Sequence, residues 1–395
     1  MLEKKATGSL FTHLQCVECG KIYPKNVLHH VCADESCKAI LAARYQWKSN
    51  TLTKEGLKNR PSSLWRYREF LPVEDEQNIV TLGEGFTPIL PLLNLKQYAA
   101  GKQVLLKDES NNPTGSFKAR GLSVAVSKAK ELGVATFVIP TAGNAGGALA
   151  AYAAKAGLKA HIFMPTLTPS AFKTETRLFG AEITEVDGNI SDCGKLAGEK
   201  AAQAGWFDVS TLKEPYRLEG KKTMGYEIAE QLSWQLPDVM LYPTGGGTGI
   251  VGIWKAFDEL EQVGWIGSNR PRMVAVQSNS CNGICTAFHQ NAPRSEYKDS
   301  GFTIANGLRV PKPYADKEIL KVLRASNGYA VSVGDSDILL ALKELASNEG
   351  LLTAPEGAAL WHAFKALSQS GWIKSGETVL LLNTGSGYKY LDNIE

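Results

Sequence analysis

From residue 102 onward, the sequence alternates short apolar segments with longer segments of helical pattern. We expect strands at residues 103–107, 135–139, 159–164, 182–186, 239–242, 273–277 and 378–382. We expect helices at residues 116–132, 144–156, 335–347 and 357–368. Two further helices should end near residues 179 and 203, and another should begin near residue 249. Strands that alternate with helices predict an α/β fold, with parallel sheets covered by helices on both faces.

The length and composition restrict the possible classes of protein. A chain of 395 residues is too long for one compact core, so we expect two or three domains. The formal charge of +3 is too small to indicate a nucleic-acid or membrane partner. No apolar run approaches twenty residues, and residues 1–10 do not resemble a signal peptide, so we expect a cytoplasmic protein. Seven cysteines, an odd number, argue against a disulfide framework.

Three glycine-rich loops lie where expected strands run into helices, at residues 141–146, 244–249 and 383–387. Ligands of open parallel sheets bind at such junctions. In the loop 244–249, three consecutive glycines allow backbone N–H groups to surround an anion at a helix N-terminus. No Gly-Lys-Ser/Thr follows, so a compact phosphate monoester fits better than a nucleotide. The alternative is a tight turn that binds no ligand.

Lys118 occupies an unusual position for a lysine. It lies in Asn111-Asn-Pro-Thr-Gly-Ser-Phe-Lys-Ala-Arg-Gly, where Ser116 is a candidate helix N-cap. The helix dipole disfavours a cation in the first turn and so favours the neutral amine, the form that attacks an aldehyde. A solvated lysine on a helix surface is an equally weighted alternative from these residues alone.

Together, the lysine, the glycine-rich loop and the polar loop residues suit pyridoxal phosphate. The stretch around Lys118 resembles the lysine motif of the fold type II pyridoxal-phosphate enzymes, and the stretch 210–223 resembles the threonine synthases within that group. The resemblance extends from about residue 13 to 390. The supporting stretches are Lys107-Asp-Glu, Thr141-Ala-Gly-Asn-Ala-Gly, Tyr242-Pro-Thr-Gly-Gly-Gly-Thr-Gly, Pro355-Glu-Gly-Ala-Ala and Asn383-Thr-Gly-Ser-Gly.

The resemblance implies a fold and a set of cofactor contacts. The fold would be like that of tryptophan synthase β, with residues 51–108 and 216–395 forming a large cofactor domain and 109–215 a smaller domain that closes over substrate. Lys118 would hold the cofactor as a Schiff base and later transfer protons. The remaining cofactor contacts would be Asn144 at the phenolic oxygen, Thr384 at the pyridine nitrogen, and Gly245, Gly246, Gly247, Thr248 and Gly249 at the phosphate. A hydroxyl at the pyridine nitrogen makes a weaker electron sink than a carboxylate would.

The resemblance also implies a substrate, O-phosphohomoserine, which is converted with water to threonine and phosphate. The loop of Thr141, Ala142, Gly143, Asn144 and Ala145 would bind the α-carboxylate. Ser210, Thr211 and Arg217 would bind the substrate phosphate, because the guanidinium fork of arginine pairs with two phosphate oxygens. A surface ion pair is the alternative role of Arg217.

Four cysteines gather in residues 1–50, which we expect to form a small appendage. Cys16 and Cys19 have the spacing of a zinc knuckle, and Cys32 and Cys37 form a second, wider pair that lacks the usual glycine. The pattern suits a structural zinc ribbon, which some threonine synthases carry, and we expect activity to persist without the metal. The alternative is a degenerate ribbon with reduced thiols.

Two rival functions stay open. A threonine or serine dehydratase, or a synthase using another phospho-amino acid, would share Lys118 and the cofactor loops but differ around Arg217. A non-catalytic protein that binds a partner through the cysteines is disfavoured by the intact lysine and loops. The expected partners are a small-molecule substrate and a second copy of this chain in a homodimer.

Overall fold

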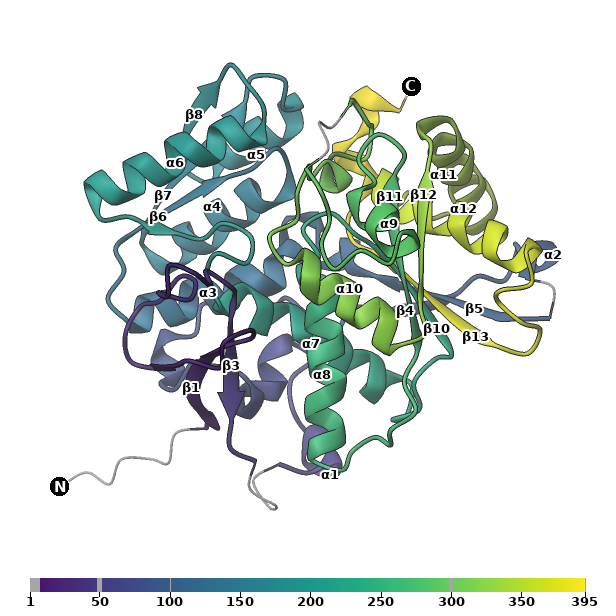
Figure 1. Cartoon of the computed structure of the whole chain (residues 1–395), viewed down its shortest axis with the longest axis horizontal. Helices are drawn as coiled ribbons and strands as arrows, with labels where there is room; N and C mark the ends of the chain where they lie inside the picture. Colours follow the sequence, from purple (N-terminus) through teal and green to yellow (C-terminus); the bar gives the residue numbers. More distant parts are fainter. Residues whose placement is uncertain (1–7, 48–51, 100, 298–300, 395) are drawn as a thin grey trace. The chain divides into compact units, whose positions relative to one another are not determined.

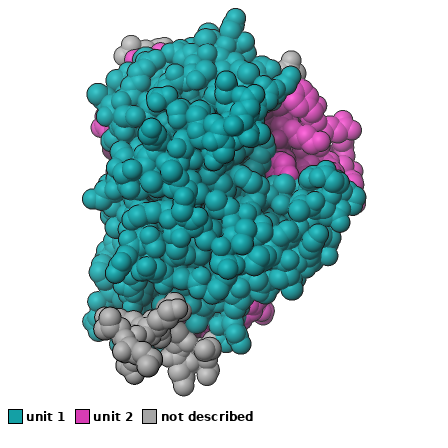
Figure 2. Space-filling model, turned by 90° about the vertical axis from the view of Figure 1, so that its left-hand side faces the viewer, with its two compact units in different colours: residues 1–86, 118–223 teal, residues 87–117, 224–395 magenta. Residues whose placement is uncertain are grey.

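The computed structural model describes residues 8–47, 52–99, 101–297 and 301–394. The chain divides into two compact units, shown in separate colours in Figure 2. Unit 1 comprises Met1–Phe86 and Lys118–Thr223, and unit 2 comprises Thr87–Phe117 and Met224–Glu395. The break expected between residues 50 and 51 lies outside the described residues, and the other domain limits and the closing motion stay predictions.

Unit 1 is built on a parallel four-stranded sheet in the order β8-β7-β6-β9 (Figure 1). Its strands are β6 (Thr136–Pro140), β7 (Lys159–Pro165), β8 (Glu182–Val186) and β9 (Phe207–Asp208). The helices of this unit are α3 (Lys118–Glu131), α4 (Asn144–Ala156), α5 (Ser170–Leu178), α6 (Ile190–Ala204) and the first half of α7 (Tyr216–Gln231).

The alternating direction of the side chains along the strands of unit 1 explains why both faces of its sheet are covered. Phe137 and Ile139 of β6 belong to the apolar cluster that contains the buried residues of α3 and α4. Val138, between them, belongs to a second cluster with Cys193 and Ala197 of α6. Successive side chains of a strand point to opposite faces, so helices pack on both sides of this sheet.

The N-terminal residues of unit 1 form a three-stranded antiparallel sheet in the order β2-β1-β3. Its strands are β1 (Phe11–Cys16), β2 (Ile22–Pro24) and β3 (Leu41–Tyr45). Short helices follow at α1 (Lys54–Leu57), η1 (Leu64–Phe70) and η2 (Glu76–Asn78). Phe11, Leu14 and Leu41 share one apolar cluster with α3 and α4, so this small sheet does not have a core of its own.

Unit 2 contains a six-stranded sheet in the order β12-β11-β10-β13-β5-β4, parallel except for β4. The strands are β4 (Ile89–Pro91), β5 (Gln103–Asp108), β10 (Val239–Pro243), β11 (Arg272–Ser278), β12 (Tyr329–Val333) and β13 (Thr378–Asn383). The helices are α2 (Lys96–Ala99), α8 (Thr248–Gln262), α9 (Gly283–His289), α10 (Asp316–Ala325), α11 (Asp335–Glu349) and α12 (Pro355–Gln369). One face of the sheet packs against α11 and α12 around the buried Trp361.

Short 3-10 helices make up the remaining helical turns of unit 2. They are η3 (Glu109–Asn111), η4 (Pro113–Gly115), η5 (Asn306–Leu308), η6 (Gly387–Lys389) and η7 (Leu391–Asn393). Among the described residues, none of the helices combines the length and apolar character that crossing a membrane requires.

The α/β architecture expected from the sequence is confirmed, and the seven expected strands agree with the observed ones to within one residue at each end. The expected N-cap at Ser116 is wrong, because α3 begins only at Lys118 and Ser116 instead bridges to Gly385. The strand β12 and the helices α9 and α10 were not expected from the sequence pattern.

Helices α3 and α7 approach each other so closely within unit 1 that their backbones touch. A methyl group on Gly220 would overlap the carbonyl oxygen of Arg120 and lie 2.8 Å from Cα of Gly121. A methyl group on Gly121 would lie 3.0 Å from the carbonyl oxygen of Arg217. The crossing therefore requires glycine at position 220 and leaves no spare room for a side chain at position 121.

We predict that Gly220→Ala destabilises unit 1, because backbone atoms cannot move aside as a flexible side chain can. The free energy of unfolding should fall by about 1–3 kcal/mol or more, as in overpacked cores. The matched control is Gly198→Ala in α6, where a methyl group meets no atom within 4 Å. That change should stabilise the helix by about 0.5–1 kcal/mol. Denaturant unfolding measures both, and equal stability of the two variants would contradict the close crossing.

Candidate active site

Lys118 is the first residue of α3 and is half-buried. The residues just before it pair with the glycine-rich loop that follows β13. The Phe117 amide donates to the Thr384 carbonyl at 3.0 Å, and the Ser386 amide donates to the Gly115 carbonyl at 2.9 Å. This backbone pairing fixes the segment that leads into Lys118 beside the loop containing Thr384, which is itself 7% exposed.

Two buried carboxylates at the end of β5 shape the turn before Lys118. Asp108 accepts hydrogen bonds from the Ser110 hydroxyl at 2.7 Å and from the side-chain amides of Asn111 at 2.8 Å and Asn383 at 2.7 Å. Glu109 accepts from the Thr87 hydroxyl at 2.6 Å and the Asn112 amide at 2.8 Å. The Lys107-Asp-Glu stretch thus organises the approach to the lysine, a role that its sequence pattern alone did not specify.

The glycine loop 245–249 of unit 2 is packed tightly between β10 and α8. Gly247 is the N-cap of α8 with φ of 79°, a left-handed conformation that favours glycine. A methyl group on Gly245 would overlap the carbonyl oxygen of Gly307, and one on Gly249 would overlap the hydroxyl of Tyr242. A backbone-lined turn at a helix N-terminus fits a phosphate group, since its N–H groups and the helix dipole both favour an anion.

Glu356 supports that loop from the first turn of α12. Its carboxylate accepts a hydrogen bond from the Gly307 amide at 2.6 Å and from the Tyr390 hydroxyl at 3.1 Å. Gly307 in turn packs against Gly245 through its carbonyl oxygen. The Pro355-Glu-Gly stretch therefore acts on the glycine loop through η5, without sequence proximity to it.

In unit 1, the loop between β6 and α4 presents a second helix N-terminus. The Thr141 hydroxyl accepts a hydrogen bond from the Gly143 amide at 3.2 Å, and Gly143 is the N-cap of α4. Ala142, Gly143 and Asn144 are half-buried, whereas Thr141 and Ala145 are buried. A helix N-terminus of this kind can bind a carboxylate.

Arg217 lies in the first turn of α7 and is only 2% exposed. Its Nη1 donates to the Val209 carbonyl at 2.6 Å, next to Ser210, while its Nε has no hydrogen-bond partner among the described residues. A buried guanidinium keeps its charge, so an unused N–H donor at this position favours an anionic ligand. A surface ion pair, the alternative considered from the sequence, does not fit this burial.

Glu214 lies just before α7 and sits beside Arg217. Its carboxylate accepts from the Tyr216 amide at 2.7 Å and from the Arg217 amide at 3.1 Å. Burial raises the pKa of Glu214 to about 7, although the charge of Arg217 opposes this. Burial likewise lowers the pKa of Arg217, against the charges of Glu214 and Asp208. A Glu214 that is protonated near neutral pH leaves the positive charge of Arg217 less compensated.

Ser210 and Thr211 lie in the turn before α7. The Ser210 hydroxyl and amide both contact the carboxylate of Asp208, the amide at 2.8 Å. Ser210 is buried and Thr211 is half-buried. The hydroxyl of Ser210 donates to Asp208, so it can offer only its lone pairs to another ligand.

The crossing of α3 and α7 brings two expected site residues into one arrangement within unit 1. Lys118 lies three residues before Gly121, and Arg217 lies three residues before Gly220. Each is therefore about one helical turn from the backbone contact. In unit 2, the paired loops likewise bring together Phe117 and Thr384.

The four N-terminal cysteines converge as a candidate metal centre. Their sulfur atoms all lie within 4.8 Å of one another, with 3.5 Å between Cys16 and Cys37 and 3.6 Å between Cys19 and Cys32. Four sulfurs at about 2.3 Å from zinc are about 3.8 Å apart in a tetrahedron, so this set fits the ion. Burial opposes ionisation of Cys32, but hydrogen bonds from Tyr23 and the Asp34 backbone outweigh it and lower the pKa of Cys32 to about 7.

Several residues that shape the site lie in stretches that carry the family resemblance, but the sequence assigned them no role. Glu214, Glu356 and Asp108 act through hydrogen bonds to segments that fold next to them. Gly121 and Gly220 could have been noticed, because each follows an expected site residue by three positions. Spacing alone does not show that two helices meet there.

Comparison with known proteins extends these observations. The profile of the family described as "Pyridoxal-phosphate dependent enzyme" matches residues 80–385. The threonine synthase of Methanocaldococcus jannaschii is 35% identical over 378 residues, which cover 95% of this chain and 92% of that protein. The threonine synthase of Methanosarcina acetivorans is 36% identical over 374 residues, 94% of this chain and 91% of that protein.

Solved structures support the fold. Maize serine racemase superposes with a TM-score of 0.67 at 20% identity, covering 83% of this chain and 94% of that chain. A fungal L-serine ammonia-lyase from Rhizomucor miehei gives a TM-score of 0.66 at 20% identity, covering 78% of this chain and 98% of that chain. The fold type II architecture expected from the sequence is thereby confirmed. This chain belongs to the pyridoxal-phosphate-dependent enzymes and, among them, to the threonine synthase family.

Proposed function

We propose that this enzyme converts O-phospho-L-homoserine and water to L-threonine and phosphate. The similar curated proteins are named threonine synthase and align over nearly the whole chain. The observation that carries the proposal is the buried Arg217, which has an unused Nε donor and lies on the helix that crosses the helix of Lys118. A dehydratase acts on a hydroxy amino acid and needs no cation for a distal phosphate.

We assign the cofactor to residues whose local structure suits its chemical groups. Bound pyridoxal phosphate withdraws electrons from the substrate, so that protons near the amino group become acidic. The tight turn before α8 would hold the cofactor's phosphate through the backbone of Gly245, Gly246, Gly247, Thr248 and Gly249. Lys118 would bind the aldehyde carbon, with Asn144 at the phenolic oxygen and Thr384 at the pyridine nitrogen.

The substrate would be held at both of its ends. The amides of residues 141–145, at the N-terminus of α4, would bind the α-carboxylate. Arg217 would bind the phosphate and stabilise it as it leaves, and the field of the α7 N-terminus would add to the charge of the arginine. Thr211 would complete this end, whereas Ser210, whose hydroxyl and amide both donate to Asp208, would shape the turn that carries them. The amine of Lys118 would remove and return protons along the substrate chain.

We further propose that Cys16, Cys19, Cys32 and Cys37 hold one structural zinc ion. Four thiolates leave no open coordination position, so the metal would not take part in the chemistry. A cytoplasmic location and a homodimeric assembly stay predictions from the sequence.

The function is tested by incubating the purified enzyme with O-phosphohomoserine. We expect phosphate and threonine in equal amounts, and Lys118→Ala should abolish both. Borohydride reduction should fix the cofactor on Lys118 in the wild type, which peptide mapping will show. Deamination of threonine or serine without phosphate release from O-phosphohomoserine would instead favour a dehydratase.

We predict that Arg217→Lys lowers kcat/KM for O-phosphohomoserine about ten- to hundredfold. Lysine keeps the charge but loses the planar fork, and one charge-assisted hydrogen bond is worth about 1.5–3 kcal/mol. The visible absorption of the cofactor should stay unchanged. The matched control is Arg177→Lys on α5, whose exposed side chain pairs with Glu185 at 2.7 Å and should not affect turnover. If Arg217→Lys lowered a slow deamination of serine as much as it lowered turnover of O-phosphohomoserine, Arg217 would have a structural role.

We predict about one zinc ion per chain, which the double variant Cys16→Ser, Cys19→Ser loses. The melting temperature should fall, because binding of the metal is coupled to folding of the small sheet. Cys193→Ala, in the core of unit 1 but away from the four thiols, should keep the metal. Elemental analysis and thermal unfolding measure these outcomes. A metal-free wild type of full stability would indicate reduced thiols.

A further inference from the structure

The small N-terminal sheet and its loops, residues 8–47, are called the ribbon here. The apolar side of the ribbon packs into the interior of unit 1. Phe11, Leu14 and Leu41 share one cluster of buried residues with Ala119 and Tyr216. Ala119 follows Lys118 in the chain, and Tyr216 precedes Arg217. The ribbon therefore contributes to the same core as the first turns of the two crossing helices.

A polar contact joins the end of the ribbon to α7. The Tyr45 hydroxyl donates to Oε2 of Glu219 at 2.7 Å, and Nζ of Lys222 contacts the same oxygen at 2.6 Å. The side chains of Glu219 and Lys222 are fully buried. Nζ of Lys222 also lies 3.9 Å from the centre of the Tyr45 ring. One tyrosine thus contacts both members of a buried ion pair, by its hydroxyl and by its ring.

The ring of Tyr45 is itself held by other aromatic residues. It lies 5.9 Å from the ring of Phe11 and is stacked on Trp47 at 5.4 Å. Trp47 in turn lies 4.8 Å from Phe70 of η1. The hydroxyl of Tyr45 therefore points at Glu219 from a ring with little freedom to move.

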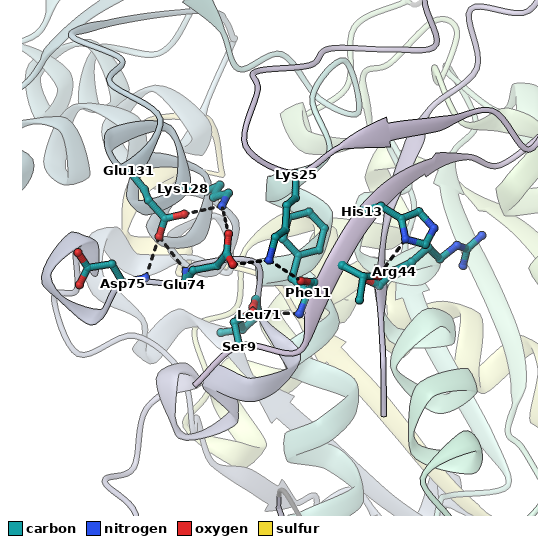
Figure 3. A network of polar contacts seen from close by, with 11 residues as sticks. Ser9, Phe11, His13, Lys25, Arg44, Leu71, Glu74, Asp75, Lys128 and Glu131 are labelled. Carbon is teal, nitrogen blue, oxygen red and sulfur yellow. Dashed lines mark hydrogen bonds and ion pairs between the residues drawn. The ribbon is translucent and has the colours of Figure 1, made fainter. Parts of the chain in front are cut away.

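The ribbon is also anchored to the far end of α3, as Figure 3 shows. Lys25 pairs with Glu74 and donates to the Phe11 carbonyl at 3.2 Å. The fully buried Lys128 of α3 lies 3.6 Å from Glu74 and also pairs with Glu131. The ribbon is thus linked to the end of α3 through Glu74, and Nζ of Lys128 also lies 5.4 Å from the centre of the Phe11 ring. Together with the contact to the beginning of α7, this leaves the ribbon little freedom to shift along unit 1.

The position of Glu219 on α7 makes the contact with Tyr45 important for Arg217. Successive residues of a helix are about 100° apart around its axis, so Glu219 and Arg217, two positions apart, point about 160° away from each other. Gly220, the next residue, is pressed against the backbone of α3. Tyr45 therefore contacts α7 on the side opposite Arg217. Helix α3 contacts α7 at Gly220, the residue that follows Glu219.

We propose that Tyr45 is a positioning residue for substrate binding. By fixing Glu219, it sets the rotation of the first turn of α7 and so the direction of the Arg217 guanidinium. The inference rests on the proposed role of Arg217 in binding the substrate phosphate. It makes the ribbon part of the substrate site's support, in contrast to an independent appendage.

The test is Tyr45→Phe in the holoenzyme, because phenylalanine keeps the ring and removes only the hydroxyl donor. We expect KM for O-phosphohomoserine and the dissociation constant of inorganic phosphate, measured by titration calorimetry, each to rise about three- to tenfold. We expect kcat and the visible absorption of the cofactor to change less than about twofold. Tyr98→Phe is the matched control, because the exposed ring of Tyr98 packs on Trp361 in unit 2. Removal of the Tyr98 hydroxyl should change neither KM nor the dissociation constant of phosphate.

The outcomes separate this proposal from the proposed function. A lower melting temperature with unchanged KM and phosphate affinity would overturn it, since Tyr45 would then only stabilise the fold. If Arg217→Lys weakens phosphate binding and Tyr45→Phe does not, the role of Tyr45 alone is overturned. If Arg217→Lys leaves phosphate affinity unchanged, the assignment of Arg217 is wrong and the role of Tyr45 is overturned with it.

Discussion

The backbone contact between α3 and α7 at Gly121 and Gly220 is the constraint on which the arrangement of unit 1 depends. Glycine at both positions lets the helices approach more closely than side chains permit. Lys118 and Arg217 each lie one turn before this contact, so the separation between the proposed cofactor lysine and the proposed phosphate ligand is set by two packed backbones. Packed backbones position catalytic groups more precisely than loops do.

Buried carboxylates organise the loops around these rigid elements. Asp108, Glu109, Glu214 and Glu356 each accept hydrogen bonds from neighbouring loops or helix termini. A buried carboxylate is costly unless its oxygens are satisfied, so each of them requires one local arrangement of its donors. Glu356 stabilises the glycine loop through Gly307, and Glu214 stabilises the start of α7 beside Arg217. The hydrogen bonds of these carboxylates fix the positions of the loops that are proposed to bind small ligands.

The ribbon extends this support to the N-terminus of the chain. Its cysteines converge in a set that fits zinc, and its apolar residues belong to the core of α3 and α4. Tyr45 connects that sheet to the buried pair of Glu219 and Lys222. Through these contacts the ribbon supports the first turn of α7, although its thiols lie outside the proposed cofactor loops.

The sequence by itself determined the α/β class and the approximate bounds of the main strands, and it supplied the candidate site residues. Alternation of apolar strands with helices and the glycine loops at their junctions are local signals, so Lys118 and residues 245–249 could be singled out directly as candidates. Only the tertiary structure showed that Arg217 is buried with an unused donor, and that Ser116 pairs with Gly385 where a helix cap had been expected. The contacts of Tyr45 with Glu219 and of Gly121 with Arg217 join residues far apart in the chain. Burial and crossing depend on which surfaces meet, and no periodicity within a single segment encodes that.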